Sequence, residues 1–142
     1  MIRGVAGFGV IAVVLVVIAC GKEKEITINH FKDFPDEING CACYFSADKD
    51  DFIKGSYIYA DNYGDTAFIS INGVMTKFML TKQTDVTEGY WIKVYNNDEY
   101  EVTVDSEEVW QVNQTWLQKG RMTVRSKKGA TTTENIYGEC GC

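Results

Sequence analysis

The chain has 142 residues, of which 45% are apolar, 13% aromatic and 24% charged, and its formal net charge is −6. The length indicates one domain, and the apolar content excludes a disordered chain. The acidic balance argues against a nucleic-acid partner, because phosphate contacts require an excess of lysine and arginine.

The first twenty residues have the layout of an export signal. Arg3 supplies a short positive start, positions 4–19 carry no charge, and the apolar run ends at Ala19-Cys20 before the polar segment GKEKE. That order describes a secretory leader. Sixteen apolar residues also fall short of the roughly 20 that a membrane-spanning helix needs. We therefore predict that residues 1–19 are a cleaved signal peptide, with a signal anchor as the alternative.

The end of this leader resembles the lipobox of bacterial lipoprotein precursors. Val17 is a branched apolar residue three positions before the cysteine, small Ala19 precedes it, and Cys20 follows. The resemblance implies a diacylglyceryl group on the Cys20 sulfur, cleavage after Ala19 and acylation of the new amine. Two or three such chains, of the palmitate type, anchor a protein stably in a membrane. Because Gly21 is not the Asp that retains some lipoproteins at the inner membrane, we expect a lipid-anchored protein of the bacterial envelope, at the outer membrane.

Removal of the leader leaves 123 residues and a net charge of −7, since Arg3 is the only charged residue lost. Residues 20–40 are predicted to hold the lipidated cysteine and a polar tether, although Phe31 and Phe34 could already pack on the domain. Residues 41–142 are predicted to form a single β domain.

The number and spacing of the cysteines support export. Lipidation of Cys20 leaves four cysteines, Cys41, Cys43, Cys140 and Cys142, in two Cys-x-Cys pairs. A bridge within such a pair is strained, whereas residues i and i+2 of a strand share one face. Two bridges between the pairs are therefore expected, either antiparallel (Cys41–Cys142 with Cys43–Cys140), which we favour, or parallel (Cys41–Cys140 with Cys43–Cys142). A four-thiolate zinc site is the alternative, but its usual spacing is Cys-x2–4-Cys and the compartment is oxidising.

Between the cysteine pairs, short runs of β-branched and aromatic residues alternate with Gly, Asn and Asp, a pattern typical of strands and turns. The predicted strands are 41–46, 56–61, 66–72, 74–81, 90–96, 99–105, 109–117, 120–126 and 131–137. Only DKDDFIKG predicts a helical turn or loop. With the first and last strands joined by cysteines, the pattern predicts an all-β fold, a small antiparallel barrel of about eight strands or a sandwich, closed by N- to C-terminal disulfides.

Two hairpins have a predicted register. Asn72-Gly73 forms a type I′ turn, because both positions require positive φ. Its predicted pairs are Ile71–Val74, Ile69–Thr76 and Ala67–Phe78. The second hairpin turns through a three-residue loop at 96–98, and its predicted pairs are Val94–Tyr100, Ile92–Val102 and Tyr90–Val104. That register also sets Lys93 opposite Glu101 as a favourable charge pair. A third hairpin turns around 127–129, with its register open.

Catalytic motifs are scarce. The only histidine, His30, lies in the tether, so no Ser-His or Cys-His arrangement can form, and no phosphate loop or nucleophile elbow appears. Asp48–Asp51 lacks the glycine and closing glutamate of a calcium loop, and Glu107-Glu108 is predicted to be an exposed charge pair. We expect no enzymatic activity, no metal and no cofactor.

Trp110 and Trp116 lie in EEVWQVNQTWLQKG, an aromatic segment flanked by amides, as in many carbohydrate-binding surfaces. Packing in the core or barrel mouth is the favoured role, and a sugar platform is the alternative. The expected function is non-catalytic binding or a structural role in the envelope, with an envelope protein or a glycan as partner.

The segment Trp116-Leu117-Gln118-Lys119-Gly120, followed by RMTVRS, resembles the Trp-x-Lys-Gly segment of lipid-anchored inhibitors of C-type lysozyme, which are small disulfide-linked barrels. The spacing is one residue longer, and the Ser-Gly-x-x-Tyr segment of that family is missing. The resemblance implies that Lys119 sits at a loop that enters an acidic enzyme cleft, whereas the favoured alternative is a simple bulge or bend at Lys119-Gly120. Lysozyme inhibition and metal handling by the four domain cysteines are the alternative functions.

Overall fold

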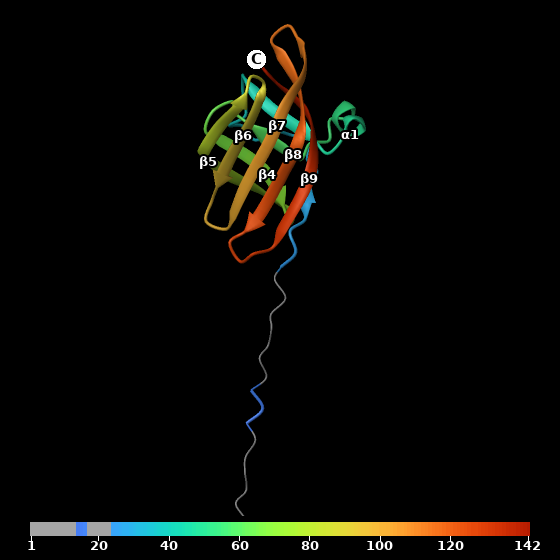
Figure 1. Ribbon diagram of the computed structural model, residues 1–142. Coiled ribbons are helices and arrows are strands. Elements are labelled where there is room, and N and C mark those ends of the chain that lie inside the picture. Colours follow the sequence, from blue (N-terminus) through green and yellow to red (C-terminus); the bar gives the residue numbers. More distant parts are fainter. Residues whose placement is uncertain (1–13, 17–23) are drawn as a thin grey trace, which may run out of the picture.

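The computed structural model describes residues 14–16 and 24–142, so that Cys20 and most of the predicted leader lie outside the described part of the chain. Figure 1 shows a β-barrel with one short helix on its outside. None of the helices within the described residues is long and apolar enough to cross a membrane.

Eight antiparallel strands close the barrel in the order β4-β3-β2-β9-β8-β7-β6-β5, with β5 pairing back to β4, and in the described residues one further strand, β1, adds to β4. The strands are β1 Ile28–Asn29, β2 Ala42–Ser46, β3 Tyr59–Asp61, β4 Thr66–Ile71, β5 Val74–Thr87, β6 Tyr90–Asn96, β7 Tyr100–Val112, β8 Thr115–Ser126 and β9 Thr131–Gly141. The predicted all-β barrel is confirmed.

Two disulfides, Cys41–Cys142 and Cys43–Cys140, join the start of β2 to the end of β9. Cys43 lies directly opposite Cys140 in the antiparallel pairing of β2 with β9. The favoured antiparallel connectivity is therefore confirmed. In this bonded state the four sulfur atoms are not thiolates, so they do not form the alternative zinc site.

The predicted strand 109–117 is wrong. Its two halves belong to different strands, because β7 runs on to Val112 and β8 starts at Thr115. Between them the chain reverses at Asn113-Gln114, where Asn113 has a φ of 54°. Asparagine tolerates this left-handed conformation better than most residues, which explains why the chain turns there. β5 is also longer than predicted, since it continues to Thr87.

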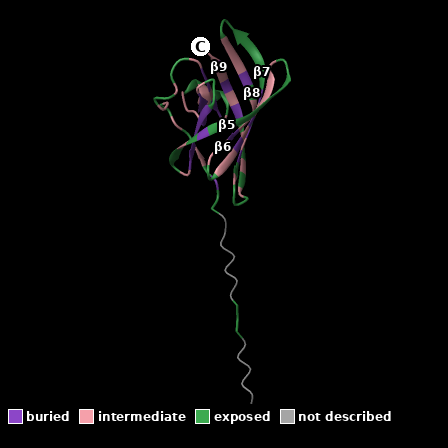
Figure 2. Cartoon of the chain, turned by 90° about the vertical axis from the view of Figure 1, so that its left-hand side faces the viewer, coloured by how far each residue is buried: buried purple, intermediate pink, exposed green. Residues whose placement is uncertain are grey.

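The core lies inside the wall and consists of side chains that alternate with outward-facing residues along each strand. Its largest fully buried apolar and aromatic members are Tyr59, Tyr95, Phe45, Phe78, Ile58, Ile69, Met122, Val102, Val104 and Val124. Figure 2 shows these buried segments in the middle of the strands and exposed residues at the far end of β7. The register predicted for β4 and β5 is confirmed, and Ile69, Ile71 and Phe78 belong to this core.

Residues 26–40, assigned to the tether from the sequence, are part of the folded unit. Ile26 is buried in the core cluster, and Phe31 forms a β-bridge with Tyr57. Phe34 stacks on Tyr57, with ring centroids 4.9 Å apart. The folded unit therefore includes these residues, and the expected packing of Phe31 and Phe34 on the domain is confirmed.

Helix α1, Lys49–Ile53, covers the outer face of β2 and β9. Asp48 is its N-cap, because its side chain accepts a hydrogen bond of 2.8 Å from the Asp51 amide. Phe52 stacks on Tyr44 and meets Tyr137 edge-on. The helical turn predicted for DKDDFIKG is thus present, and it extends the aromatic packing outside the barrel.

The two ends of the barrel differ in the segments that they carry. At one end of the barrel, which we call the N-terminal end, residues 27–29 lie beside the β4–β5 turn. There the Thr27 amide donates to Asn72 Oδ1, and the Gly73 amide donates to Asn29 Oδ1. The opposite end, which we call the rim, carries the β3–β4 loop, the β5–β6 turn, the β7–β8 turn and the C-terminus (Figure 1).

Candidate functional site

The register of β6 with β7 differs from the predicted one and decides which side chains enter the barrel. Tyr95 pairs with Val102, and Lys93 pairs with Val104 rather than lying opposite Glu101. The shift is by an odd number of residues, so it reverses the face on which each β6 side chain lies relative to β7. Lys93 and Tyr95 consequently point into the barrel, and the predicted surface charge pair with Glu101 is wrong.

The turn chemistry explains this register. Asn97 Oδ1 accepts hydrogen bonds from the amides of Glu99 and Tyr100, at 2.9 and 2.8 Å. An asparagine side chain that bonds amides two and three positions ahead stabilises a turn that begins at that residue. The loop therefore starts one residue later than predicted and Asn96 stays in β6, opposite Glu101.

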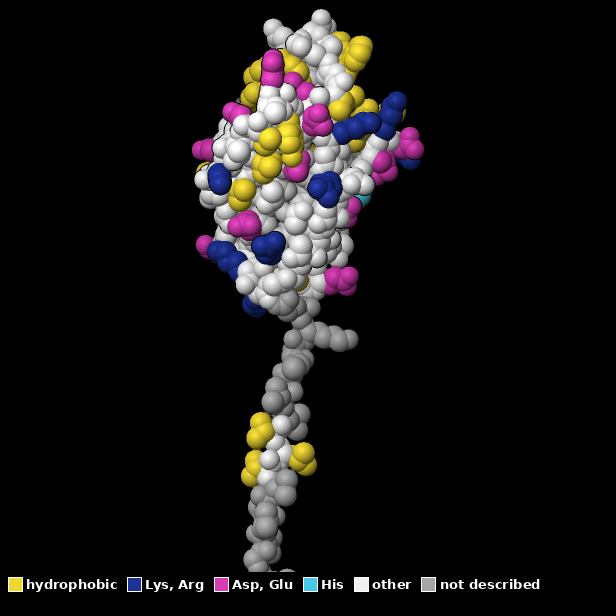
Figure 3. All heavy atoms as spheres, in the orientation of Figure 1, with side chains coloured by type: hydrophobic (Ala, Val, Ile, Leu, Met, Phe, Trp, Pro, Cys, Tyr) yellow, Lys and Arg dark blue, Asp and Glu magenta, His cyan; other side chains and the backbone are white. Residues whose placement is uncertain are grey.

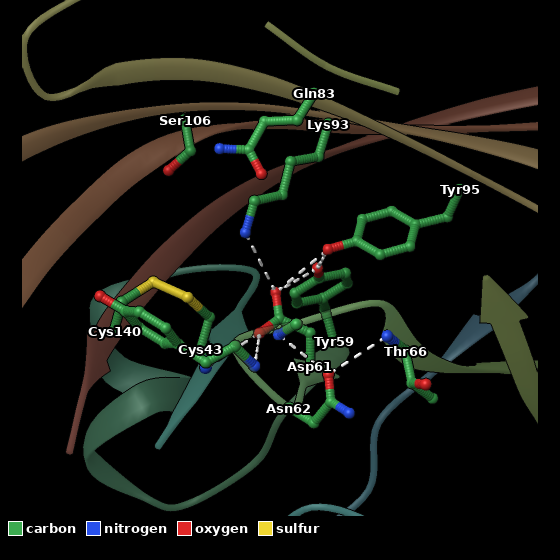
Figure 4. A network of polar contacts seen from close by, with 12 residues as sticks. Cys43, Tyr59, Asp61, Asn62, Thr66, Gln83, Lys93, Tyr95, Ser106 and Cys140 are labelled. Carbon is green, nitrogen blue, oxygen red and sulfur yellow. Dashed lines mark hydrogen bonds and ion pairs between the residues drawn. A yellow bond between two sulfur atoms is a disulfide. The ribbon is translucent and has the colours of Figure 1, made fainter. Parts of the chain in front are cut away.

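Four polar residues form a buried group that we call the Asp61 cluster, namely Tyr59, Asp61, Lys93 and Tyr95 (Figure 4). Asp61 is fully buried and accepts hydrogen bonds on Oδ2 from the hydroxyls of Tyr59 at 2.6 Å and Tyr95 at 3.3 Å. Its Oδ1 accepts from the amides of Cys43 at 3.3 Å and Tyr63 at 2.8 Å. The carboxylate thus ties a disulfide-bearing strand to the start of the β3–β4 loop.

Lys93 lies at the boundary between this cluster and the rim. Its side chain is 11% exposed, and its Nζ lies 3.9 Å from Asp61 Oδ2, an ion-pair distance longer than a hydrogen bond. The same ammonium lies 4.5 Å from the ring centroid of Trp91, within the range of a cation–π interaction. The Coulomb attraction and the aromatic face together hold this charge inside a barrel.

Further polar side chains lie at this part of the barrel: Ser106 and Gln118 are buried in the interior, whereas Gln83 is exposed above it. Gln83 pairs with Lys93 across β5 and β6, and the Ser106 hydroxyl donates to Gln118 Oε1 at 2.7 Å. Figure 4 shows Gln83 and Ser106 on the same side of Asp61 as the Lys93 ammonium. The interior is therefore polar toward the rim and apolar toward its middle.

Burial raises the pKa of the Tyr59 hydroxyl well above its ordinary value, and the negative charge of Asp61 raises it further. Burial and the same carboxylate also raise the pKa of Tyr95. Both side chains therefore remain neutral phenols that donate hydrogen bonds to Asp61.

The rim carries exposed apolar side chains. Trp110 is 66% exposed and Val112 is 56% exposed, and Val86, Val109 and Tyr63 are also exposed at this end. These residues come from three separate connections, the β3–β4 loop, the β5–β6 hairpin and the β7–β8 hairpin. The rim therefore carries exposed apolar side chains from distant parts of the sequence.

The two candidate tryptophans of the β7–β8 hairpin lie on opposite faces. Trp110 pairs with Leu117, whereas Trp116 pairs with Gln111 and, across β9, with Cys140. Because directly paired residues share a face, Trp116 is on the same side as the buried Cys140, and Trp110 points outward. The structure does not combine them into one aromatic platform.

Lys119 does not lie in a loop. It is in the middle of β8, paired with Glu107 and Tyr137, and its Nζ lies 5.7 Å from the Tyr137 ring on the outer wall. The expected bulge is also elsewhere, at the register shift between Glu108 and Trp110. Gly120 serves close packing instead, because a Cβ there would lie 1.8 Å from the Asp105 carbonyl oxygen. Both expectations for Lys119-Gly120 are therefore wrong.

Charge is distributed unequally between the ends. The rim carries a set of carboxylates, Asp65, Asp85, Glu88, Glu107 and Glu108. The N-terminal end carries both signs, with Lys24, Lys127 and Lys128 near Asp98 and Glu99. Figure 3 shows acidic and hydrophobic side chains side by side on the upper part of the visible face.

A hollow of about 380 Å³ lies at the N-terminal end, between the β4–β5 and β6–β7 turns. Lys24, Asn72, Lys77, Asn97 and Glu99 contribute its polar lining. It is thus a polar depression beside the place where the chain reaches the barrel, away from the Asp61 cluster.

Among the residues that the structure describes, no group of three His, Cys, Asp or Glu side chains is placed to hold a metal ion. Comparison of the chain with protein-family models, with curated proteins and with solved structures gives no match. The residues of the site themselves therefore carry the functional argument.

Proposed function

We propose that the protein is a lipid-anchored lipoprotein of the bacterial envelope whose barrel is a non-catalytic binding domain with the rim as its binding surface. The observation that carries this proposal is the placement of the two ends. Cys20 is four residues ahead of Lys24, and Lys24 lines the hollow at the N-terminal end. An acyl anchor on Cys20 would therefore hold that end toward the membrane and present the rim away from it.

A binding role fits the chemistry of the described side chains better than catalysis. Asp61 is occupied by four hydrogen bonds, from β2, β3, β6 and the β3–β4 loop, and by its ion pair with Lys93. His30 contacts Ser56 Oγ at 2.9 Å and Asp51 at 3.8 Å, in the segment outside the barrel. By contrast, exposed apolar side chains flanked by charges are typical of an interaction site.

The two alternative functions depended on residues that have other roles in this fold. Metal handling depended on four thiolates, and these cysteines form two disulfides. Lysozyme inhibition depended on Lys119 at a loop, and this residue lies in the outer wall of β8. We therefore do not propose either role.

Metabolic labelling with a fatty acid tests the anchor. The wild type should incorporate labelled palmitate, and the Cys20→Ala variant should not. Cys142→Ala is the matched control, because it also removes one cysteine and should keep the label. Equal labelling of the wild type and Cys20→Ala would refute the anchor.

Tryptophan fluorescence tests the orientation, because all three tryptophans, Trp91, Trp110 and Trp116, belong to the rim half of the barrel. In vesicles of brominated phosphatidylcholine, the anchored wild type should show no quenching relative to unbrominated vesicles. A Val74→Trp variant, at an exposed position of the N-terminal end, should be quenched. Quenching of the wild type would show that the rim contacts the membrane and would overturn the proposed orientation.

A further inference from the structure

We propose that the rim binds an extended, positively charged segment of a partner protein, which adds as a strand to the free edge of β7 formed by Val109–Val112. This inference rests on the proposed function, because it names the chemistry of the partner for the same rim. Three observations carry it: an unpaired strand edge, exposed apolar side chains along it, and carboxylates around it.

The edge is free because β6 ends before β7 does. The last pair between these strands is Tyr90 with Glu107, and the Glu108 amide donates to the Gly89 carbonyl at 2.7 Å. Beyond that point, within the described part of the chain, β7 pairs only with β8. Residues 109–112 therefore present one side without a neighbouring strand.

The hairpin geometry indicates which main-chain groups face that side. Val112 and Thr115 flank the two-residue turn, so they form the hydrogen-bonded pair next to it. Pairs alternate along an antiparallel ladder, so Gln111 and Trp116 form a non-hydrogen-bonded pair. The amide and carbonyl of Gln111 are therefore directed away from β8, toward an incoming strand.

The side chains of this edge suit strand addition. Trp110 and Val112 project from one face at 66% and 56% exposure, and Trp110 supplies a large apolar contact. The other free edge at this end, residues 81–87 of β5, carries Lys82 and two register shifts, which are devices that discourage pairing. In β7 the register shift lies between Glu108 and Trp110, so residues 110–112 pair regularly with β8.

The charge around the free edge of β7 indicates which class of partner would bind there. Glu88 and Glu108 lie beside the edge at the β5–β6 turn, and Glu107 lies there too, although it is paired with Lys119 of β8. Residues 107–118 contain no lysine or arginine. A cationic segment gains Coulomb attraction from these carboxylates, whereas a second copy of this chain would place the same acidic residues against them. Main-chain pairing with charge complementarity therefore favours a basic, extended segment of another protein.

A peptide titration of the detergent-solubilised full-length protein tests this inference. The probe is a heptapeptide of alternating lysine and valine, and its binding is followed by the fluorescence of the rim tryptophans. A lysine–glycine peptide and a glutamate–valine peptide should each bind at least tenfold more weakly. The same lysine–valine peptide, N-methylated along one edge, should bind with at least tenfold lower affinity, because it cannot form the main-chain hydrogen bonds of a strand ladder.

Variants locate the site. Trp110→Ala and the double variant Glu88→Lys/Glu108→Lys should each weaken binding at least tenfold. The matched controls at the N-terminal end, Val74→Ala and Asp98→Lys/Glu99→Lys, remove an exposed apolar side chain or make the same charge change, and should alter binding less than twofold.

Equal effects at both ends, full binding of the N-methylated peptide, or equal binding of the lysine–glycine peptide would overturn the inference. Tight, Trp110-dependent binding of the glutamate–valine peptide would also overturn it, while leaving the rim as a binding surface. Because the titration needs no membrane, its failure is distinguishable from a failure of the fatty-acid labelling.

Discussion

Lys93 Nζ lies 3.9 Å from Asp61 Oδ2, and this ion pair connects β6 with β3, two strands that are not neighbours in the barrel wall. It spans the interior toward the rim, where Asp61 is fully buried and the lysine side chain is 11% exposed. The pair, together with the hydroxyls of Tyr59 and Tyr95, links opposite sides of the barrel close to the proposed binding surface.

Removal of the Asp61 carboxylate should cost more stability than removal of the Lys93 ammonium. Asp61→Ala leaves two tyrosine hydroxyls and two amides without their acceptor and an ammonium without its counter-charge, so we expect the free energy of unfolding to fall by about 3–5 kcal/mol. Lys93→Met should cost less, because Asp61 keeps its four hydrogen bonds. Urea unfolding followed by tryptophan fluorescence measures both, and the reverse order would contradict the assignment of Asp61 as the centre of the cluster.

Stability should decline at alkaline pH. The pKa values of Tyr59 and Tyr95 are raised in the folded protein, so above about pH 10 the unfolded chain releases protons that the folded one retains. The free energy of unfolding then falls with rising pH, by up to about 1.4 kcal/mol per pH unit for each tyrosine, and is unaffected by these groups below pH 9. Urea titrations between pH 9 and 11.5 should show this slope.

Tyr59→Phe and Tyr95→Phe should each reduce that alkaline slope. Val104→Ala is the control, because it removes buried apolar volume without a titrating group and should lower stability equally at each pH. A slope that is the same in the wild type and in both phenylalanine variants would rule out these tyrosines as its source.

The two disulfides should be strongly non-additive. Either bridge alone closes a loop of about 100 residues, worth about 4.7 kcal/mol in the chain-entropy model. Once one is formed, the second closes a ring of only a few residues, worth about 2 kcal/mol in the same model. Cys41→Ala/Cys142→Ala and Cys43→Ala/Cys140→Ala should thus each cost about 2 kcal/mol, and removal of all four cysteines about 7 kcal/mol. A cost for the removal of all four cysteines that equals the sum of the two double-variant costs, measured by denaturant unfolding, would contradict this loop arithmetic.

Gly138→Ala should destabilise the barrel by about 3 kcal/mol or more. Gly138 pairs with Phe45, and a Cβ there would lie 2.1 Å from the Tyr44 carbonyl oxygen and 2.8 Å from the Phe45 Cα, atoms that cannot move without shifting β2. Gly64→Ala is the comparison, because its Cβ would meet only the flexible Asn62 side chain at 3.3 Å. The thermal unfolding midpoint of Gly138→Ala should be clearly lower than that of Gly64→Ala. Similar midpoints would show that β2 shifts at little cost in stability.

The barrel and its disulfides could be predicted because their signals are local. Alternating residues and an Asn-Gly dipeptide specify strands and one hairpin, and the i, i+2 spacing of the cysteines puts both sulfurs of a pair on one face. The sequence also predicted a helical turn or loop at DKDDFIKG, where α1 lies.

The candidate site could not be predicted in the same way. In YWIKVYN the even positions Ile92 and Val94 are the more hydrophobic, so hydrophobicity alone favours that face for the core. The structure directs Tyr95 and Lys93 into the barrel instead, where Asp61, more than thirty residues earlier, is their partner. Likewise, the segment 109–117 reads as one β-rich run, and only the Asn113-Gln114 reversal divides it between β7 and β8.

The cysteine pairs have one more consequence, which concerns proteolysis. The β8–β9 turn at Lys127-Lys128 is exposed and offers a cleavage site for trypsin-like enzymes. A cut there separates Cys41 and Cys43 from Cys140 and Cys142 in sequence, but both fragments stay joined through two covalent bridges. A nicked molecule would therefore remain in one piece, and only a reductant, rather than the protease, would break the covalent connection to its last strand.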